Sequence, residues 1–286
     1  MFIQLTVSGI AIGAIYALVA IGFTLLWQAS RTVNFAQGDF ITVSAVFMYM
    51  LMCMGVPLIW ALLATVVLSA VMLGYIVKRG IIEPLMERSH TTIIVATIAL
   101  SFLASNAIGV FWSSQCKAFP RVFGMTPIRL GSVVLSRQHV WTIVISIILI
   151  LAINLFIQKT KPGKAMQAVA QNRDAAKVLG INISSVTTMV FVINAILVAF
   201  VAMLIAPVYM LRYDMGATLG LKAFYAATIG GFNQIRGALL GGFLVGLIET
   251  FSSAYLSTEY REFFVLAVLI AVILIRKEGL LGTEER

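Results

Sequence analysis

The feature that most constrains the fold is a series of long apolar segments separated by short polar junctions. The first thirty residues contain no charged side chain, and comparable apolar stretches recur along the whole chain. A helix of about 20 apolar residues is long enough to cross the hydrocarbon core of a bilayer. The nine segments predicted as spans are residues 3–27, 39–55, 57–77, 91–112, 138–158, 184–209, 219–233, 238–256 and 261–275.

Composition excludes a soluble globular domain. Of the 286 residues, 61% are hydrophobic and only 11% are charged, and the mean hydropathy is +1.03. A soluble domain of this length cannot bury that much apolar surface. We therefore predict an all-α integral membrane protein in which residues 1–286 form a single transmembrane domain. It is expected to be a polytopic helical bundle of about eight to nine spans, with broken or re-entrant helices.

The net charge of +9 does not indicate nucleic-acid binding, because the 20 Lys and Arg lie mostly in short loops beside the spans. Basic residues in such loops favour the cytoplasmic side and thereby set the orientation. Their distribution places the N-terminus outside and the C-terminus in the cytoplasm, which requires an odd number of crossings. The loop of residues 113–137 is an exception, because it carries four basic residues and no acid yet lies outside in this topology.

The longest polar stretch between two spans covers residues 159–182. It begins with a Pro-Gly pair, is rich in alanine, and ends at Gly180, a pattern typical of a helix with a defined stop. We predict a cytoplasmic surface helix at about 162–181, free of bulky side chains and able to dock into a groove on another protein. Its candidate contact residues are Gly163, Ala165, Ala168, Asn172, Arg173, Ala176, Leu179 and Gly180.

Two polar, glycine-bearing breaks interrupt the apolar segments, one in each half of the chain. The first reads Asn-Phe-Ala-Gln-Gly-Asp over residues 34–39, and the second reads Gly-Gly-Phe-Asn-Gln-Ile-Arg-Gly over residues 230–237. Paired interruptions are the pattern expected of a transporter's solute pathway, although loops at the membrane surface would give the same pattern. The candidate pathway residues are Asn34, Phe35, Gln37, Gly38, Asp39, Gly230, Gly231, Asn233 and Gly237.

Glycines four residues apart occur in the first and eighth predicted spans. This spacing allows helix backbones to approach closely and predicts a tightly packed bundle. The candidate packing residues are Gly9, Gly13, Gly241, Gly242 and Gly246. Glu249 lies in the same eighth span, and an ionisable residue inside a span is a functional candidate because its burial in lipid is costly. The alternatives for Glu249 are a transport role, a structural hydrogen bond and a neutral, protonated state.

No catalytic or metal-binding constellation is found in the sequence. The two histidines lie at the ends of different spans and predict no metal site. The Gly163-Lys164 pair lacks the other residues of a phosphate-binding loop. We therefore expect no catalytic residue, no metal and no cofactor on this chain, so that ATP-driven transport would require a motor on a separate subunit.

Several ordered motifs, at residues 13–24, 33–40, 163–172, 179–182, 222–246, 252–260 and 279–282, resemble those of a known family. The chain is similar to the permease subunits of branched-chain amino acid ABC transporters, of the LivH/LivM type, and is most similar to the LivH side. The resemblance covers nearly the whole chain.

The resemblance implies a location in the bacterial cytoplasmic (inner) membrane and a set of partners. These are a second, LivM-like permease subunit, two ATP-binding subunits that carry ATP and Mg, and a periplasmic or surface-tethered solute-binding protein. It also implies that the predicted cytoplasmic helix couples to an ATPase. The bilayer is the remaining partner, and no nucleic acid is expected.

Departures from the family pattern leave the solute open. Gln37 stands where the family usually has His, Asp39 where it has Glu, and Asn172 where it often has Asp. The main hypothesis is import of branched-chain or similar amino acids, and the same architecture could import urea, short amides or aromatic acids. An ion-coupled secondary transporter, with Glu249 and Asp39 as ion or proton sites, is the alternative of a different class. An intramembrane enzyme ranks last.

Overall fold

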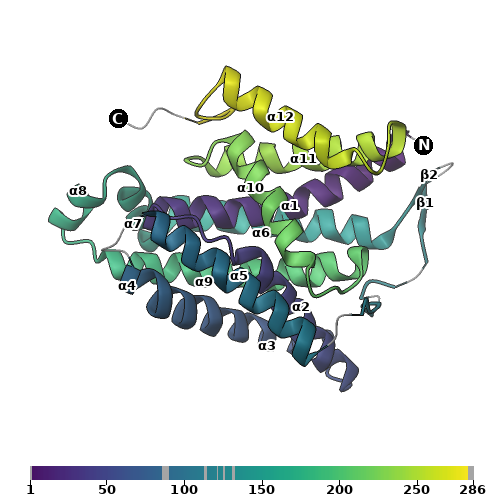
Figure 1. Ribbon diagram of the computed structural model, residues 1–286, viewed down its shortest axis with the longest axis horizontal. Helices are drawn as coiled ribbons and strands as arrows, with labels where there is room; N and C mark the ends of the chain where they lie inside the picture. The colour runs from purple at the N-terminus through teal and green to yellow at the C-terminus, as the bar shows by residue number, and fades with distance from the viewer. Residues whose placement is uncertain are drawn as a thin grey trace. The chain divides into compact units, whose positions relative to one another are not determined.

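The computed structural model describes residues 2–85, 90–112, 115–120, 122–124, 126–130 and 133–282. The helices are α1 (Phe2–Ser30), α2 (Gln37–Cys53), α3 (Leu58–Val71), the π-helix η1 (Met72–Ile82), α4 (Glu83–Leu85), α5 (His90–Phe111), α6 (Arg137–Lys159), α7 (Lys161–Gln171), α8 (Arg173–Val178), α9 (Ile183–Tyr209), α10 (Met215–Gly230), α11 (Ile235–Tyr255) and α12 (Arg261–Ile275) (Figure 1). Strands β1 (Ile128–Leu130) and β2 (Val133–Leu135) form an antiparallel hairpin with Ile128 opposite Leu135.

The helices fit a membrane bundle. Within the described residues, six are long and apolar enough to cross a membrane, namely Phe2–Ser30, Leu58–Leu85, Thr91–Phe111, Arg137–Lys159, Ile183–Tyr209 and Ile235–Tyr255. Every one of the nine predicted segments coincides with a helix, and the all-α class is confirmed. The count of eight to nine crossings stays a prediction. The third segment is longer than predicted, because α3 continues through η1 and α4 to Leu85.

The chain forms two compact units. Unit 1 consists of Met1–Thr24, Pro120–Ile147 and Leu221–Arg286. In it, α11 packs beside α12 (Figure 1) and crosses the first part of α1. A Cβ atom at Gly242 would collide with Ala17, and one at Gly246 would collide with Gly13. Because glycine has no side chain, the two backbones can lie in direct contact there.

The remaining packing glycines of unit 1 lie at the same kind of crossing. Gly9 contacts Leu247 of α11, and Gly13 contacts the backbone of Phe243. Gly241 faces the other way, toward the carbonyl oxygen of Ala226 on α10. The glycine-rich face of α11 therefore lies between α1 and α10.

Unit 2 consists of Leu25–Phe119 and Ile148–Gly220 and is built around α9. This helix packs against α2, α3 and η1. Its side chains are apolar on most sides, and large ones such as Phe191 and Leu204 are fully buried. A helix that is apolar all round is stable when other helices or lipid surround it. The core of unit 2 therefore lies along α9.

The predicted single cytoplasmic helix is two helices in the structure. Asn172 separates α7 from α8 and has an extended backbone, with φ −154° and ψ 109°. Its side-chain oxygen accepts a hydrogen bond from the amide of Ala175 at 2.9 Å and so caps the start of α8. The prediction was wrong at this point because it weighed the helix propensity of the alanines above the capping preference of asparagine.

The C-terminal end of this segment follows the predicted stop. Gly180 has a φ of +81°, which glycine adopts without steric cost. Its amide donates to the carbonyl of Lys177 at 3.1 Å, and the amide of Ile181 donates to the carbonyl of Ala176 at 3.0 Å. These two bonds form a Schellman motif. The chain can therefore turn sharply from α8 into α9.

Candidate functional site

The first break, between α1 and α2, is enclosed in unit 2. Asn34 is 1% exposed, and its side-chain oxygen accepts a hydrogen bond from the amide of Ala36 at 3.1 Å. The Nδ2 group of Asn34 has no hydrogen-bond partner among the described residues. A buried donor without a partner costs about 1–3 kcal/mol. A water molecule or a polar group of a solute that accepted a hydrogen bond from this Nδ2 group would therefore remove that cost.

One face of α5 holds the first break in position. The amide of Phe35 donates to the hydroxyl of Thr97 at 3.3 Å. The hydroxyls of Ser101 and Ser105 both donate to the fully buried carboxylate of Asp39, the Ser105 bond being 2.5 Å long. Hydrogen bonds of this kind offset the cost of removing a carboxylate from water.

The sequence analysis missed this face of α5. Its signal was the spacing of Thr97, Ser101 and Ser105, because residues four apart lie on the same side of a helix. What the spacing did not reveal was which element the hydroxyls face.

The start of α2 also makes a close backbone contact. A Cβ atom at Gly38 would collide with the carbonyl oxygen of Gly216, and one at Gly216 would collide with that of Gly38. Gln37 is 1% exposed, and its backbone N–H donates to the backbone carbonyl of Asn34 at 3.2 Å. All five pathway candidates of the first break therefore lie together, and the break is closely packed in this conformation.

The second break, between α10 and α11, is a separate local site in unit 1. The amides of Leu280 and Leu281 donate to the carbonyls of Ile229 and Gly230, at 2.8 and 3.0 Å. Gly231, with a φ of +107°, lies against the same tail. The C-terminal residues 279–282 thus cover the end of α10, a relationship that the sequence analysis missed.

The other candidates of the second break follow from this arrangement. Gly237 lies against the carbonyl of Gly230, where any side chain would collide with the backbone. Asn233 lies in the turn that leads into α11. The ring of Phe232 packs on that of Phe224, with centroids 5.4 Å apart. The second break is therefore a tight turn closed by the C-terminal tail.

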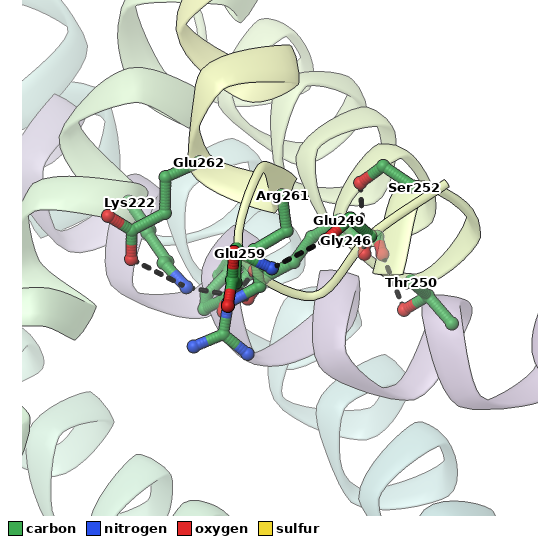
Figure 2. A network of polar contacts seen from close by, with 10 residues as sticks. Lys222, Gly246, Glu249, Thr250, Ser252, Glu259, Arg261 and Glu262 are labelled. Atoms are coloured by element: carbon green, nitrogen blue, oxygen red, sulfur yellow. Dashed lines mark hydrogen bonds and ion pairs between the residues drawn. The ribbon is translucent and has the colours of Figure 1, made fainter. Parts of the chain in front are cut away.

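A cluster of charges, centred on the buried pair Glu249 and Lys222, links α10, α11 and α12 in unit 1, and Figure 2 shows its acidic and basic side chains. Glu249 of α11 is 4% exposed and accepts a hydrogen bond from the Tyr16 hydroxyl at 2.7 Å. Its Oε1 lies 2.5 Å from Nζ of Lys222 and 3.7 Å from Nε of Arg261. Nζ of Lys222 also lies 3.9 Å from Glu262. Two acids and two bases thus balance one another in the bundle.

The sequence analysis singled out Glu249 but not its partners. Tyr16, Lys222 and Arg261 come from α1, α10 and α12, so the cluster connects all four helices of this region. Buried charges are tolerated when they are paired and hydrogen-bonded. The geometry assigns Glu249 an ion pair and a hydrogen bond within this chain.

The helices α7 and α8 expose part of the predicted coupling surface. Gly163 and Ala176 are buried against the chain itself, so these two candidates cannot contact a partner directly. A side chain at Gly163 would collide with the end of α6. The half-buried candidates are Ala165, Ala168 and Arg173, and the exposed ones are Asn172, Leu179 and Gly180.

The most exposed apolar side chains of this segment lie at its tip. Val178 is 87% exposed and Leu179 is 78% exposed. Both follow directly on the charged face of α8, in a polar stretch rather than in an apolar span. Because they lie outside the apolar spans, these two side chains are candidates for contact with another protein. Val178 was missed because the prediction favoured small residues.

Comparison with known proteins identifies the family. The family model described as "Branched-chain amino acid transport system / permease component" matches residues 5–273. The chain belongs to this family.

Two curated relatives cover this permease almost from end to end. The high-affinity branched-chain amino acid permease protein LivH of Salmonella typhimurium is 31% identical, over 99% of this chain and 96% of the relative. The corresponding protein BraD of Pseudomonas aeruginosa is 30% identical, over 99% and 97%. A solved structure of PsaBC from Streptococcus pneumoniae with a Fab shares the fold, with a TM-score of 0.53 and 14% identity, covering 94% of this chain and 90% of that one.

A groove of about 560 Å³ lies beside α8 of the permease. Its lining contains both signs of charge, from Lys78, Glu83, Arg173, Asp174 and Lys177. Nζ of Lys78 lies 2.9 Å from Glu83 and donates to the hydroxyl of Thr188 at 2.7 Å, so this lysine fixes the end of η1 against α9. The groove and the exposed tip both involve α8 and its C-terminal turn, because Lys177 and Gly180, which line the groove, flank Val178 and Leu179 in the chain.

Proposed function

We propose that this permease is the membrane subunit of an ABC importer for branched-chain or similar amino acids. ATP hydrolysis on separate subunits would drive the transport. The exposed apolar tip at Val178 and Leu179, beside the charged groove, carries the proposal, because it offers a motor subunit a place to bind. The similarity to LivH and BraD over 99% of the chain favours this solute class.

The proposed assembly follows from the same similarity. This chain pairs with a second, LivM-like permease, and two ATP-binding subunits dock on α7 and α8 in the cytoplasm. A solute-binding protein delivers the solute from outside. The permease lies in the bacterial cytoplasmic membrane with its N-terminus outside and its C-terminus inside, as the distribution of Lys and Arg favours.

The first break is the proposed moving part of the pathway. In the enclosed conformation, the hydroxyls of α5 hold Asp39 and the backbone of Phe35. Displacement of α2 relative to α5 would release these bonds and uncover Asn34. On opening, water or solute would take the place of the α5 hydroxyls as hydrogen-bond partners of Asp39 and Phe35. Opening therefore requires little net loss of hydrogen bonding.

Reconstitution tests the proposal. The permease is purified with its partner subunits, placed in liposomes with the binding protein, and supplied with radiolabelled leucine and ATP. Solute-stimulated ATP hydrolysis and uptake are expected. Absence of both would contradict the proposal, whereas flux by this chain alone under an ion gradient would favour a secondary transporter. The ligand that copurifies with the binding protein distinguishes amino acids from urea, short amides and aromatic acids.

A further inference from the structure

Arg31 has an unusual backbone conformation directly after α1. Its φ is +54°, in the left-handed region where residues other than glycine are disfavoured. Its amide donates to the carbonyl of Trp27 at 2.8 Å and so ends the helix. Glycine would satisfy this turn with less strain. The backbone alone therefore gives no reason for an arginine here.

The side chain of Arg31 reaches the cytoplasmic segment. Its Nη2 group donates to the carbonyl of Ala170 at 3.2 Å, in the last turn of α7. Carbonyls at the end of a helix lack partners within the helix and carry partial negative charge, so a guanidinium is favourable there. Arg31 thus connects the start of the first break to the helix that is proposed to dock on an ATPase.

The connection between Arg31 and the pathway residues is short and braced. The hydroxyls of Ser30 and Thr32 lie 2.8 Å apart, and that of Ser30 donates to the carbonyl of Leu26 at 2.7 Å. Both side chains are buried. Asn34 follows only three residues after Arg31. A displacement of Arg31 is therefore passed along a stiff turn rather than absorbed by a flexible loop.

We infer that Arg31 is a positioning residue that transmits movement of α7 to the first break. The inference rests on the proposed function, because it requires a motor that moves α7. The break is held by α7, through Arg31, and by α5, through Thr97 and the serines that bind Asp39. Movement of α7 relative to α5 would therefore pull on the break and open it.

The test is the number of ATP molecules hydrolysed per leucine imported by the reconstituted complex with its binding protein. Arg31→Gly suits the backbone and removes the guanidinium. We expect it to assemble and to hydrolyse ATP, but to raise this ratio by about tenfold, as a lost coupling free energy would. Arg31→Lys, which keeps a donor and a positive charge, should restore part of the coupling.

Met210 provides a matched control. Its φ is +60°, and it is the other non-glycine residue with positive φ in the part of the chain that the structure describes. Met210→Gly makes the same kind of backbone change at the end of α9 and should leave the ratio unchanged.

Two results would overturn the inference while leaving the proposed function intact. One is an unchanged ratio in Arg31→Gly. The other is a parallel loss of hydrolysis and uptake with a lower melting temperature, which would assign Arg31 a purely structural role. Absence of leucine-stimulated hydrolysis in the unaltered complex would instead contradict the proposed function, and this inference with it.

Discussion

Nζ of Lys222 lies 2.5 Å from Oε1 of Glu249, and both side chains are almost completely buried in unit 1. The two residues are 27 positions apart, on α10 and α11. Removing either charge from water is expensive, and the pair is tolerated because each neutralises the other. The hydrogen bond from Tyr16 and the nearby Arg261 complete the cluster.

Neutralising one member of the pair should destabilise unit 1 strongly. Glu249→Gln leaves Lys222 buried without its main partner, and a broken buried pair typically costs about 3–5 kcal/mol. The double variant Glu249→Gln with Lys222→Gln should recover part of this loss, because no uncompensated charge remains between α10 and α11. Thermal unfolding of the purified protein in detergent measures the three variants.

The exposed Glu259 provides the control for the charge cluster, because it lies in the same region outside the buried pair (Figure 2). Glu259→Gln should change stability by less than about 0.5 kcal/mol. A double variant less stable than both single variants would contradict the pairing argument.

The serines of α5 should be needed to keep the first break closed. Ser101→Ala with Ser105→Ala leaves the buried carboxylate of Asp39 without its two hydroxyl donors, and a hydrogen bond to a charged group contributes about 1.5–3 kcal/mol. We expect faster hydrogen exchange of residues 34–39 and impaired uptake. Asn106→Ala is the control, because Asn106 is on the same helix but bonds to the carbonyl of Phe102. Unchanged exchange in the double variant would contradict this role.

The exposed tip of α8 should determine the affinity for the ATPase subunit. Leu179→Asp places a charge at the centre of the proposed apolar contact, and we expect binding to weaken by about tenfold or more, as at other interface hot spots. Titration of the purified permease with the ATPase measures this affinity. Lys177→Gln, which leaves the apolar tip intact, should have a smaller effect. Equal affinity of Leu179→Asp and the unaltered permease would exclude the tip as a docking site.

Replacement of Gly163 tests the placement of α7 and α8 rather than the surface that they expose. Gly163 is buried where α7 leaves α6, and its amide donates to the hydroxyl of Thr160 at 3.1 Å. Gly163→Pro removes that bond and introduces atoms at a position where even a Cβ atom would collide with the backbone of α6. We therefore expect misplaced α7 and α8 helices, whereas a bulky residue at the half-buried Ala168 should impair docking alone.

The connection between α9 and α10 should keep its protection over a wide pH range and lose a small part of it in acid. Arg212 binds Asp214 through two hydrogen bonds, of 2.9 and 2.6 Å, which lower the pKa of Asp214 below its ordinary 3.8. A carboxyl group whose pKa is lower in the folded than in the unfolded protein stabilises the fold. This contribution is complete at pH values above the ordinary pKa and is lost as the pH falls through the folded-state pKa.

Hydrogen exchange of residues 210–215, corrected for the intrinsic rate, measures this dependence. Protection should be constant between about pH 8 and 5 and should decrease below about pH 3.8. Asp214→Asn should abolish the decrease. A loss of protection near neutral pH would contradict the assignment to Asp214.

The sequence predicted the structural features that depend on residues close together in the chain. Apolar length identified the nine apolar helical segments, the glycine pairs marked where α1 and α11 cross, and Gly180 marked the end of α8. The local prediction failed at Asn172, where two local preferences compete in one stretch. Alanine favours continuation of the helix, and asparagine favours a cap. The hydrogen bond from the amide of Ala175 to the side chain of Asn172 shows that the cap prevailed.

The partners of the site residues could not be predicted, because they are distant in the chain. Asp39 and Ser101 are 62 residues apart, Tyr16 and Glu249 are 233 apart, and Arg31 and Ala170 are 139 apart. Hydrophobic periodicity indicates which face of a helix is apolar, but it does not indicate which polar groups on different helices contact one another.

By itself, the sequence determined that this chain is a helical membrane protein with two polar breaks and one long polar segment between spans, because the bilayer imposes length and apolarity on every span. The tertiary structure alone decided that Glu249 is neutralised by Lys222, that α5 holds the first break and the C-terminal tail covers the second, and that Arg31 reaches α7. The reason is that buried polar groups must be paired, and only the packing of the helices decides which groups can meet.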